Sequence, residues 1–96
     1  MPAYLIANID LHDAERYKDY VEGVPALIEK HRGKYRVRGG DSQVLEGRWS
    51  PSRLIILEFP DREAALAFYN DPEYEPYKSL RQSISDSSLI LVDGYG

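Results

Sequence analysis

The stretch "RLIILEFP" at residues 53–60 is the clearest strand signal in this chain of 96 residues. Every second residue from 55 to 59 is large and apolar, and the alternate positions from 54 to 58 hold Leu54, Ile56 and Glu58. β-branched and aromatic side chains favour extended backbone, and the closing proline cannot donate a hydrogen bond to a sheet. Both faces carry apolar residues, which indicates a strand with neither face freely solvated.

Outward from this strand, apolar periodicity and helix caps predict a single α+β domain over residues 1–96. The expected elements are a strand at 3–10, a helix from Asp13 to Gly33, strands at 34–38 and 53–59, helices at 62–69 and from Pro72 through Ile84, and a strand at 88–93. This β-α-β-β-α-α-β order is a ferredoxin-like βαββαβ arrangement with a four-stranded antiparallel sheet. Helices then cover one face of that sheet.

The other face of the predicted sheet carries Tyr4, Ile6, Leu54 and Ile56. An exposed apolar face of this kind marks an interface or a binding cleft. Two copies that pack these faces together would close it. We therefore expect a homodimer in which the paired sheets form a dimeric α+β barrel.

Composition narrows the function classes. The net charge is −4, so binding to a phosphate backbone is not favoured and we expect no nucleic-acid partner. No apolar run of about 18 residues is present and the first residues lack a basic signal-peptide region, so we expect no membrane span and a cytoplasmic location. Zero cysteines and the absence of metal-ligand spacing or a dinucleotide motif predict no metal and no cofactor.

Strand alternation assigns Asn8, Arg38 and Glu58 to the face away from the helices, where they are expected to converge. A guanidinium fork suits a carboxylate, which is either Glu58 or an acidic or carbonyl-bearing ligand. Two interpretations remain open: a ligand site, with Glu58 as a base and the other two as oxyanion donors, or a structural Arg-Glu pair inside the dimer. The pair Gly39-Gly40 predicts a bulge at the rim of this cleft.

Four more side chains are candidates for binding a ligand. Trp49 is either a lid over the cleft or an aromatic that packs within its hairpin. Tyr69, Tyr74 and Arg81 are expected on one face of the last helices, either lining one end of the cleft or packing on the sheet or a partner.

Four motifs closely resemble the domain-of-unknown-function 1330 family over nearly the whole chain. They are "VRGG" (37–40), "VLEGRWSPSRLIILEFP" (44–60), "AFYNDPEYEPYKSLR" (67–81) and "LILVDG" (89–94). The resemblance implies a dimeric α+β barrel and supplies no activity, because its superfamily includes cofactor-free monooxygenases, isomerases and proteins without known chemistry. We therefore expect an uncharacterised protein with a small-molecule cleft. The alternatives are a cofactor-independent monooxygenase or isomerase acting on a small aromatic or carbonyl compound, and a structural dimer whose cleft is filled.

Overall fold

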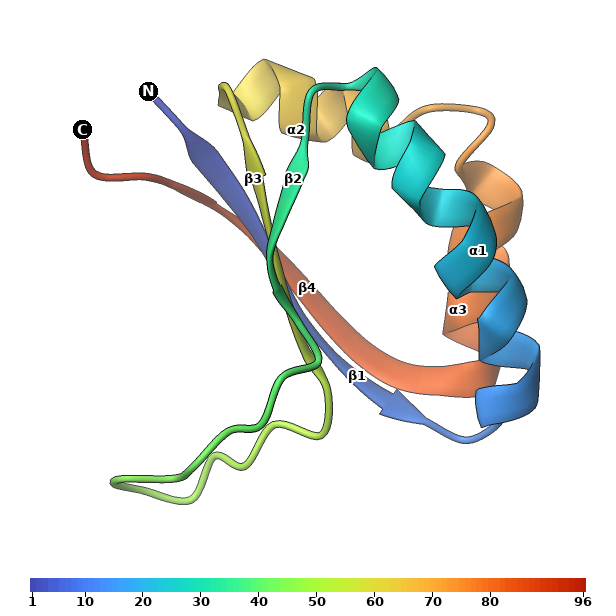
Figure 1. The fold of residues 1–96 in the computed structure, drawn as a ribbon, viewed down its shortest axis with the longest axis vertical. Helices are drawn as coiled ribbons and strands as arrows, with labels where there is room; N and C mark the ends of the chain where they lie inside the picture. Colours follow the sequence, from blue (N-terminus) through green and yellow to red (C-terminus); the bar gives the residue numbers. More distant parts are fainter.

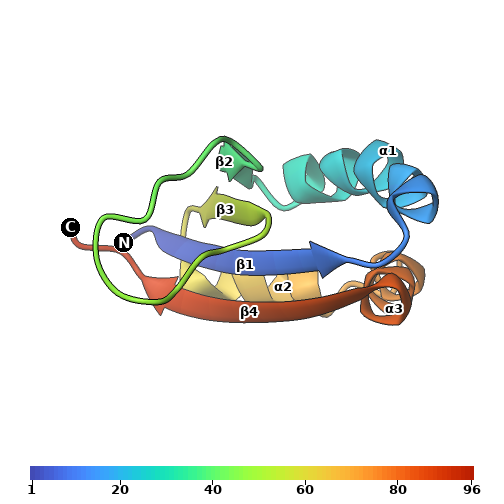
Figure 2. The ribbon, with the colours of Figure 1, turned by 90° about the horizontal axis from the view of Figure 1, so that it is seen from below.

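The computed structural model describes residues 1–96 as a ferredoxin-like fold of three helices on one four-stranded sheet (Figure 1). Its elements are β1 (Ala3–Leu11), α1 (Ala14–Lys30), β2 (Lys34–Arg38), β3 (Leu54–Phe59), α2 (Arg62–Tyr69), α3 (Glu75–Ile84) and β4 (Ser85–Asp93). The strands are antiparallel and lie in the order β2-β3-β1-β4 (Figure 2). The predicted fold class is thereby confirmed.

The first two helices begin where their caps predict. The Asp13 carboxylate accepts a hydrogen bond from the backbone N of Arg16 at 3.1 Å, and Asp61 accepts one from Ala64 N at 2.8 Å. These bonds satisfy donors that a helix start leaves free. The third helix begins at Glu75, later than predicted, because residues 71–74 form a separate hydrogen-bonded turn.

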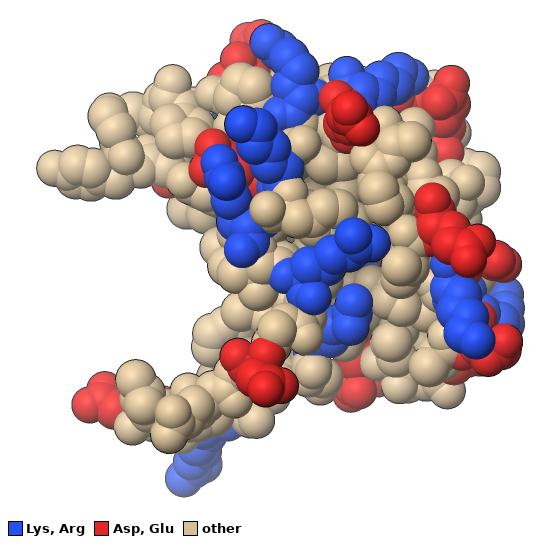
Figure 3. All heavy atoms as spheres, in the orientation of Figure 1, with Lys and Arg blue, Asp and Glu red and all other residues tan.

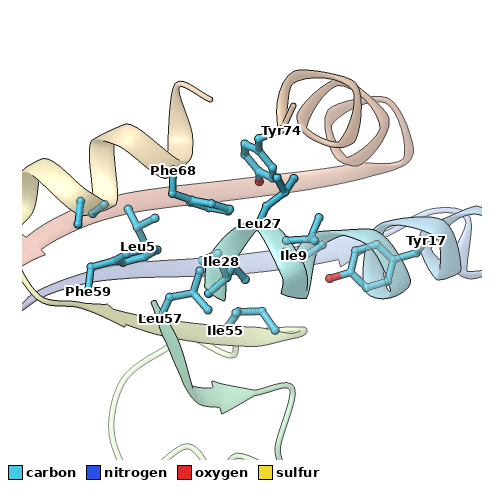
Figure 4. Packing of buried hydrophobic residues seen from close by; sticks show 14 of the residues in the cluster. Leu5, Ile9, Tyr17, Leu27, Ile28, Ile55, Leu57, Phe59, Phe68 and Tyr74 are labelled. Carbon is cyan, nitrogen blue, oxygen red and sulfur yellow. The ribbon is translucent and has the colours of Figure 1, made fainter. Parts of the chain in front are cut away.

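The hydrophobic core lies between the helices and one face of the sheet (Figure 4). Alternate residues of the two central strands, β1 and β3, point into it, as the period of two along a strand requires. Phe68 packs on Phe59 and Tyr74, with ring centroids 5.6 and 4.5 Å apart. This aromatic stack joins α2 and the start of α3 to the middle of the sheet.

A bulge in β2 decides which way its last side chains point. Tyr35 lies opposite Leu57, but Val37 lies opposite Ile56, so one extra residue is inserted between them. An extra residue reverses the alternation of faces beyond the bulge. Arg38 consequently pairs with Ile55 and lies on the helix side, so its predicted place on the open face was wrong. The bulge was expected at Gly39-Gly40 and instead lies between residues 35 and 37.

The sheet face away from the helices is open, and the segment 39–53 projects on that side as a long arm (Figure 1). Apolar side chains remain uncovered there, among them Ile90, which is 58% exposed, and Val92. Figure 3 shows a hollow on this side, bounded by the arm at one end. None of the three helices is long and apolar enough to cross a membrane.

Candidate functional site

A small cavity of about 40 Å³ lies between the helix-covered face of the sheet and the helices α1 and α3. It is large enough for a few water molecules. Of its 17 lining residues, 14 are hydrophobic, and the remaining three are Arg38, Arg53 and Arg81. A mostly apolar recess with a few convergent polar groups is the usual form of a small-molecule site.

Arg81 is a buried cation at the α3 wall of the cavity. It is 4% exposed, and its Nη1 donates a hydrogen bond to Ser87 Oγ of β4 at 2.6 Å. Burial alone would lower the pKa of Arg81, but the neighbouring Tyr74 and Tyr20 hydroxyls raise that pKa above its usual value. Arg81 therefore stays charged and has a structural partner in the protein.

Arg53 differs from Arg81 because its buried Nε has no hydrogen-bond partner. Its guanidinium carbon lies 5.5 Å from the centroid of the Tyr17 ring. A side chain at Gly39 would put its Cβ 2.6 Å from Arg53 Nη1, so this glycine leaves room for the guanidinium. A buried N–H without an acceptor costs about 1–3 kcal/mol, and in a native protein such a group is explained by strain, by a functional role or by a bound water, ion or ligand.

Arg38 stands at the mouth of the cavity. Its guanidinium lies 4.3 Å from the Tyr35 ring centroid, and its Nη2 donates to the Val21 carbonyl of α1 at 3.4 Å. The far side of Arg38 borders a surface groove of about 510 Å³, and Ile28, Tyr35 and Arg38 line both spaces. Arg38 is thus an exposed side chain at the boundary of the cavity and the groove, held by one long hydrogen bond and by its contact with the Tyr35 ring.

Tyrosines supply the neutral donors of the site. Figure 4 shows Tyr17 and Tyr74 turning their hydroxyl groups toward the middle of the core. The Tyr20 and Tyr74 hydroxyls hydrogen-bond each other at 2.6 Å. Burial, together with Tyr74, raises the pKa of Tyr20 well above its usual value, so this phenol stays protonated and can donate.

The lining contains no Asp, Glu or His, so the three arginines give the cavity a positive character. The ion pairs of the structure involve other basic residues. Basic side chains also run down the middle of the face that carries β2 (Figure 3). No group of three or more His, Cys, Asp or Glu side chains is positioned to hold a metal ion.

The predicted convergence of Asn8, Arg38 and Glu58 does not occur. Asn8 lies on the open face, where its Oδ1 accepts from the backbone N of Ser52 at 2.9 Å and of Arg53 at 3.2 Å. Asn8 therefore fixes the main chain that carries Arg53. Arg38 lies on the other side of the sheet because of the bulge.

Glu58 also lies on the open face, where it pairs with Arg36 at 3.3 Å and accepts from the Tyr4 hydroxyl at 3.3 Å. A carboxylate that acts as a general base near neutral pH needs a raised pKa. The hydrogen bond from Arg36 is the largest influence, and it lowers the pKa of Glu58. A carboxylate on the far face of the sheet cannot act as the base in this cavity.

Of the other candidates, Tyr74 and Arg81 line the cavity and Tyr69 and Trp49 do not. The Tyr69 ring packs under Lys78 Nζ at 4.0 Å, and Trp49 is 65% exposed on the arm. The ligand-binding roles given to these four side chains stay predictions.

Sequence reasoning missed Arg53, Tyr17, Tyr20 and Tyr35. One signal was available for Arg53, since it shares the alternation of Ile55 and the other inward residues of β3. An arginine on the buried face of a strand, without an evident acidic partner, is a functional candidate. The tyrosines carried no such signal, because aromatic residues on a helix stripe are usual core residues.

Comparison with known proteins supports the fold. A family model described as "Domain of unknown function (DUF1330)" matches residues 2–95. No curated protein matches.

Several solved structures are similar. A protein of unknown function from Rhodopseudomonas palustris is 23% identical with a TM-score of 0.81, covering 99% of this chain and 83% of that one. A dimeric ferredoxin-like protein of unknown function from Jannaschia sp. CCS1 is 10% identical with a TM-score of 0.73, covering 98% and 100%. SnoaB, a cofactor-independent oxygenase from Streptomyces nogalater, is 12% identical with a TM-score of 0.67, covering 99% and 94%. At these identities the likeness shows the fold alone.

Proposed function

We propose that this chain, which belongs to the DUF1330 family of unknown function, binds a small organic molecule in the cavity between its sheet and its helices. The observation that carries this proposal is the lining itself, which is apolar except for three arginines. A guanidinium nitrogen buried without a protein acceptor is unusual in a core that serves only for packing.

A cavity-filling variant tests the proposal. Ala7 is buried on β1 and lines the cavity, so Ala7→Val places two further methyl groups there in a residue that favours strands. Ligands can be sought by thermal shift in a library of acidic and neutral fragments. We expect hits on the wild type that disappear with Ala7→Val and persist with Ala67→Val, a matched change on the exposed side of α2. Hits that persist in the filled variant would contradict the proposal.

We also propose that the protein works as a homodimer that joins the open sheet faces. Ile90 and Val92 of β4 are uncovered there and adjoin Tyr4 and Ile6 of β1 in the same register. A contiguous apolar face favours association. The Jannaschia neighbour described as dimeric supports this proposal.

Light scattering coupled to size-exclusion chromatography tests the assembly. We expect a dimer for the wild type and a folded monomer for Ile90→Lys, which places a charge at the centre of the apolar face. A wild-type protein that is monomeric at high micromolar concentration would contradict the dimer proposal and would not affect the cavity proposal.

A second candidate function is cofactor-independent oxygenase chemistry, which one structural neighbour's description names. Arginine and tyrosine donors around the cavity favour it, because such donors stabilise an oxyanion. Dioxygen uptake with 2,5-dihydroxybenzoate, an acid with an oxidisable ring, measures this activity. Uptake above the protein-free rate that is lost with Ala7→Val would support it, and uptake equal to the protein-free rate would count against it.

A further inference from the structure

The charges around the cavity define the class of its occupant. Arg38, Arg53 and Arg81 line it, and no acidic side chain does. A cationic ligand would be repelled, whereas an anionic ligand would supply a counter-charge and an acceptor for Arg53, whose buried Nε has no partner in the protein. Arginine presents a planar fork of donors that matches the two oxygens of a carboxylate.

The main chain that carries the Arg53 donor is fixed before any ligand arrives. Asn8 holds its backbone N at 3.2 Å, and its carbonyl accepts a hydrogen bond from Ile9 N at 2.9 Å. Gly39 leaves space for the guanidinium, whose Nε remains buried without an acceptor. A side chain that is packed and whose main chain is held in position loses less freedom when it binds a ligand, which favours affinity.

We propose that the cavity binds a monocarboxylate with an apolar body, whose carboxylate accepts a hydrogen bond from Arg53 Nε. This inference rests on the proposed function and names the ligand class of the same site. Apart from the arginines and the tyrosine hydroxyls the lining is apolar, so most of its surface suits an apolar body on the ligand. A ligand with one carboxylate and an apolar body fits a cavity that has arginines at some positions and apolar side chains at most others.

Arg38 limits the size of the apolar body that the ligand can have. The cavity of about 40 Å³ is smaller than an aromatic ring requires, whereas the adjoining groove measures about 510 Å³. Arg38 is exposed, and in this proposal its side chain leaves the Val21 carbonyl and opens a path between the two spaces. A ligand then places its carboxylate inside and extends its body past Tyr35 into the groove.

Isothermal titration calorimetry with benzoate and benzamide tests the proposal at pH 7, where benzoate is ionised and benzamide is a neutral compound of similar shape. We expect benzoate to bind the wild type at least about tenfold more tightly than benzamide. Arg53→Met should remove that preference, and Arg53→Lys, which keeps the charge, should restore part of it. Arg16→Met is the matched control, because Arg16 is an exposed cation of α1 outside the cavity lining.

The outcomes separate the two proposals. Benzamide that binds as tightly as benzoate would overturn the carboxylate inference and leave a small-molecule cavity in place. A preference for benzoate that survives Arg53→Met, or that Arg16→Met removes equally, would also overturn the inference. Binding of neither compound, repeated with butyrate and butyramide as smaller probes, would overturn the inference together with the cavity function.

Discussion

Replacing Arg53 with methionine should stabilise the ligand-free protein, although Arg53 is the residue that we expect to hold the ligand. Methionine keeps the length of the side chain and all main-chain hydrogen bonds, and it removes the buried Nε that has no acceptor. A binding residue that strains the free protein is a known trade-off between stability and function.

The magnitude follows from two opposing contributions. Removing an unsatisfied buried N–H relieves about 1–3 kcal/mol. Losing the contact with the Tyr17 ring, 5.5 Å from the guanidinium, costs about 0.5–1 kcal/mol. The net gain is about 1 kcal/mol, which corresponds to about 4–8 °C in Tm for a domain of this size.

Arg81→Met provides the contrast, because Arg81 donates to Ser87 Oγ and lies beside two tyrosine hydroxyls. Its loss should destabilise the protein by about 1.5–3 kcal/mol, the worth of a charged hydrogen bond. Urea denaturation at pH 7 without ligand measures both variants, with Arg16→Met as the control for the change in net charge. An Arg53→Met protein less stable than the wild type by 1 kcal/mol or more, or an unchanged Arg81→Met protein, would refute this reasoning.

Three other predictions concern stability. A Cβ at Gly23 would overlap the Tyr77 ring, so Gly23→Ala should destabilise the protein by about 1–2 kcal/mol in urea melts. In a Tyr77→Ala background only helix propensity acts, and there the same change should stabilise the protein. A change of the same sign in both backgrounds would contradict this explanation. Hydrogen bonds, the one from His31 first, hold the pKa of Asp71 below its ordinary 3.8. The contribution of the Asp71 carboxylate to the free energy of unfolding is therefore complete at neutral pH. The loss of stability caused by Asp71→Asn should become smaller as the pH falls below 3.8, and a loss that becomes larger would contradict this prediction. Asn8→Ala leaves two backbone N–H groups without their acceptor and should lower the free energy of unfolding by about 1–3 kcal/mol in the same melts. Asn8→Asp keeps the acceptor and should lower it less. An equal loss in both variants would contradict the role of Asn8 as the acceptor for these two groups.

The fold could be predicted because its signals are local. The alternation around Ile55 and Leu57 indicated a strand, and the Asp13 and Asp61 caps marked two helix starts. Helix and strand periods depend only on backbone geometry, so one sequence suffices to read them. The cytoplasmic location stays a prediction.

The site could not be predicted in the same way, because a single inserted residue reverses a face. Counting along β2 assigned Arg38 to the open side, but the bulge after Tyr35 turns it toward the helices. A bulge depends on pairing with β3, which the β2 sequence does not encode alone. The sequence therefore assigned Arg38 to the open face of the sheet, whereas the cavity proposed here lies on the helix-covered face, which Arg53 shares by its alternation with Ile55.

The most direct test of the central claim is the ¹H–¹⁵N resonance of the Arg53 Nε–H group, assigned by its loss in Arg53→Lys. This group is buried and has no acceptor in the free protein. On titration with benzoate at pH 7 we expect its proton to move downfield and saturate with the binding curve, with no comparable shift for benzamide. An Arg53 resonance that does not move while benzoate binds would show that the carboxylate lies elsewhere, and would contradict the account.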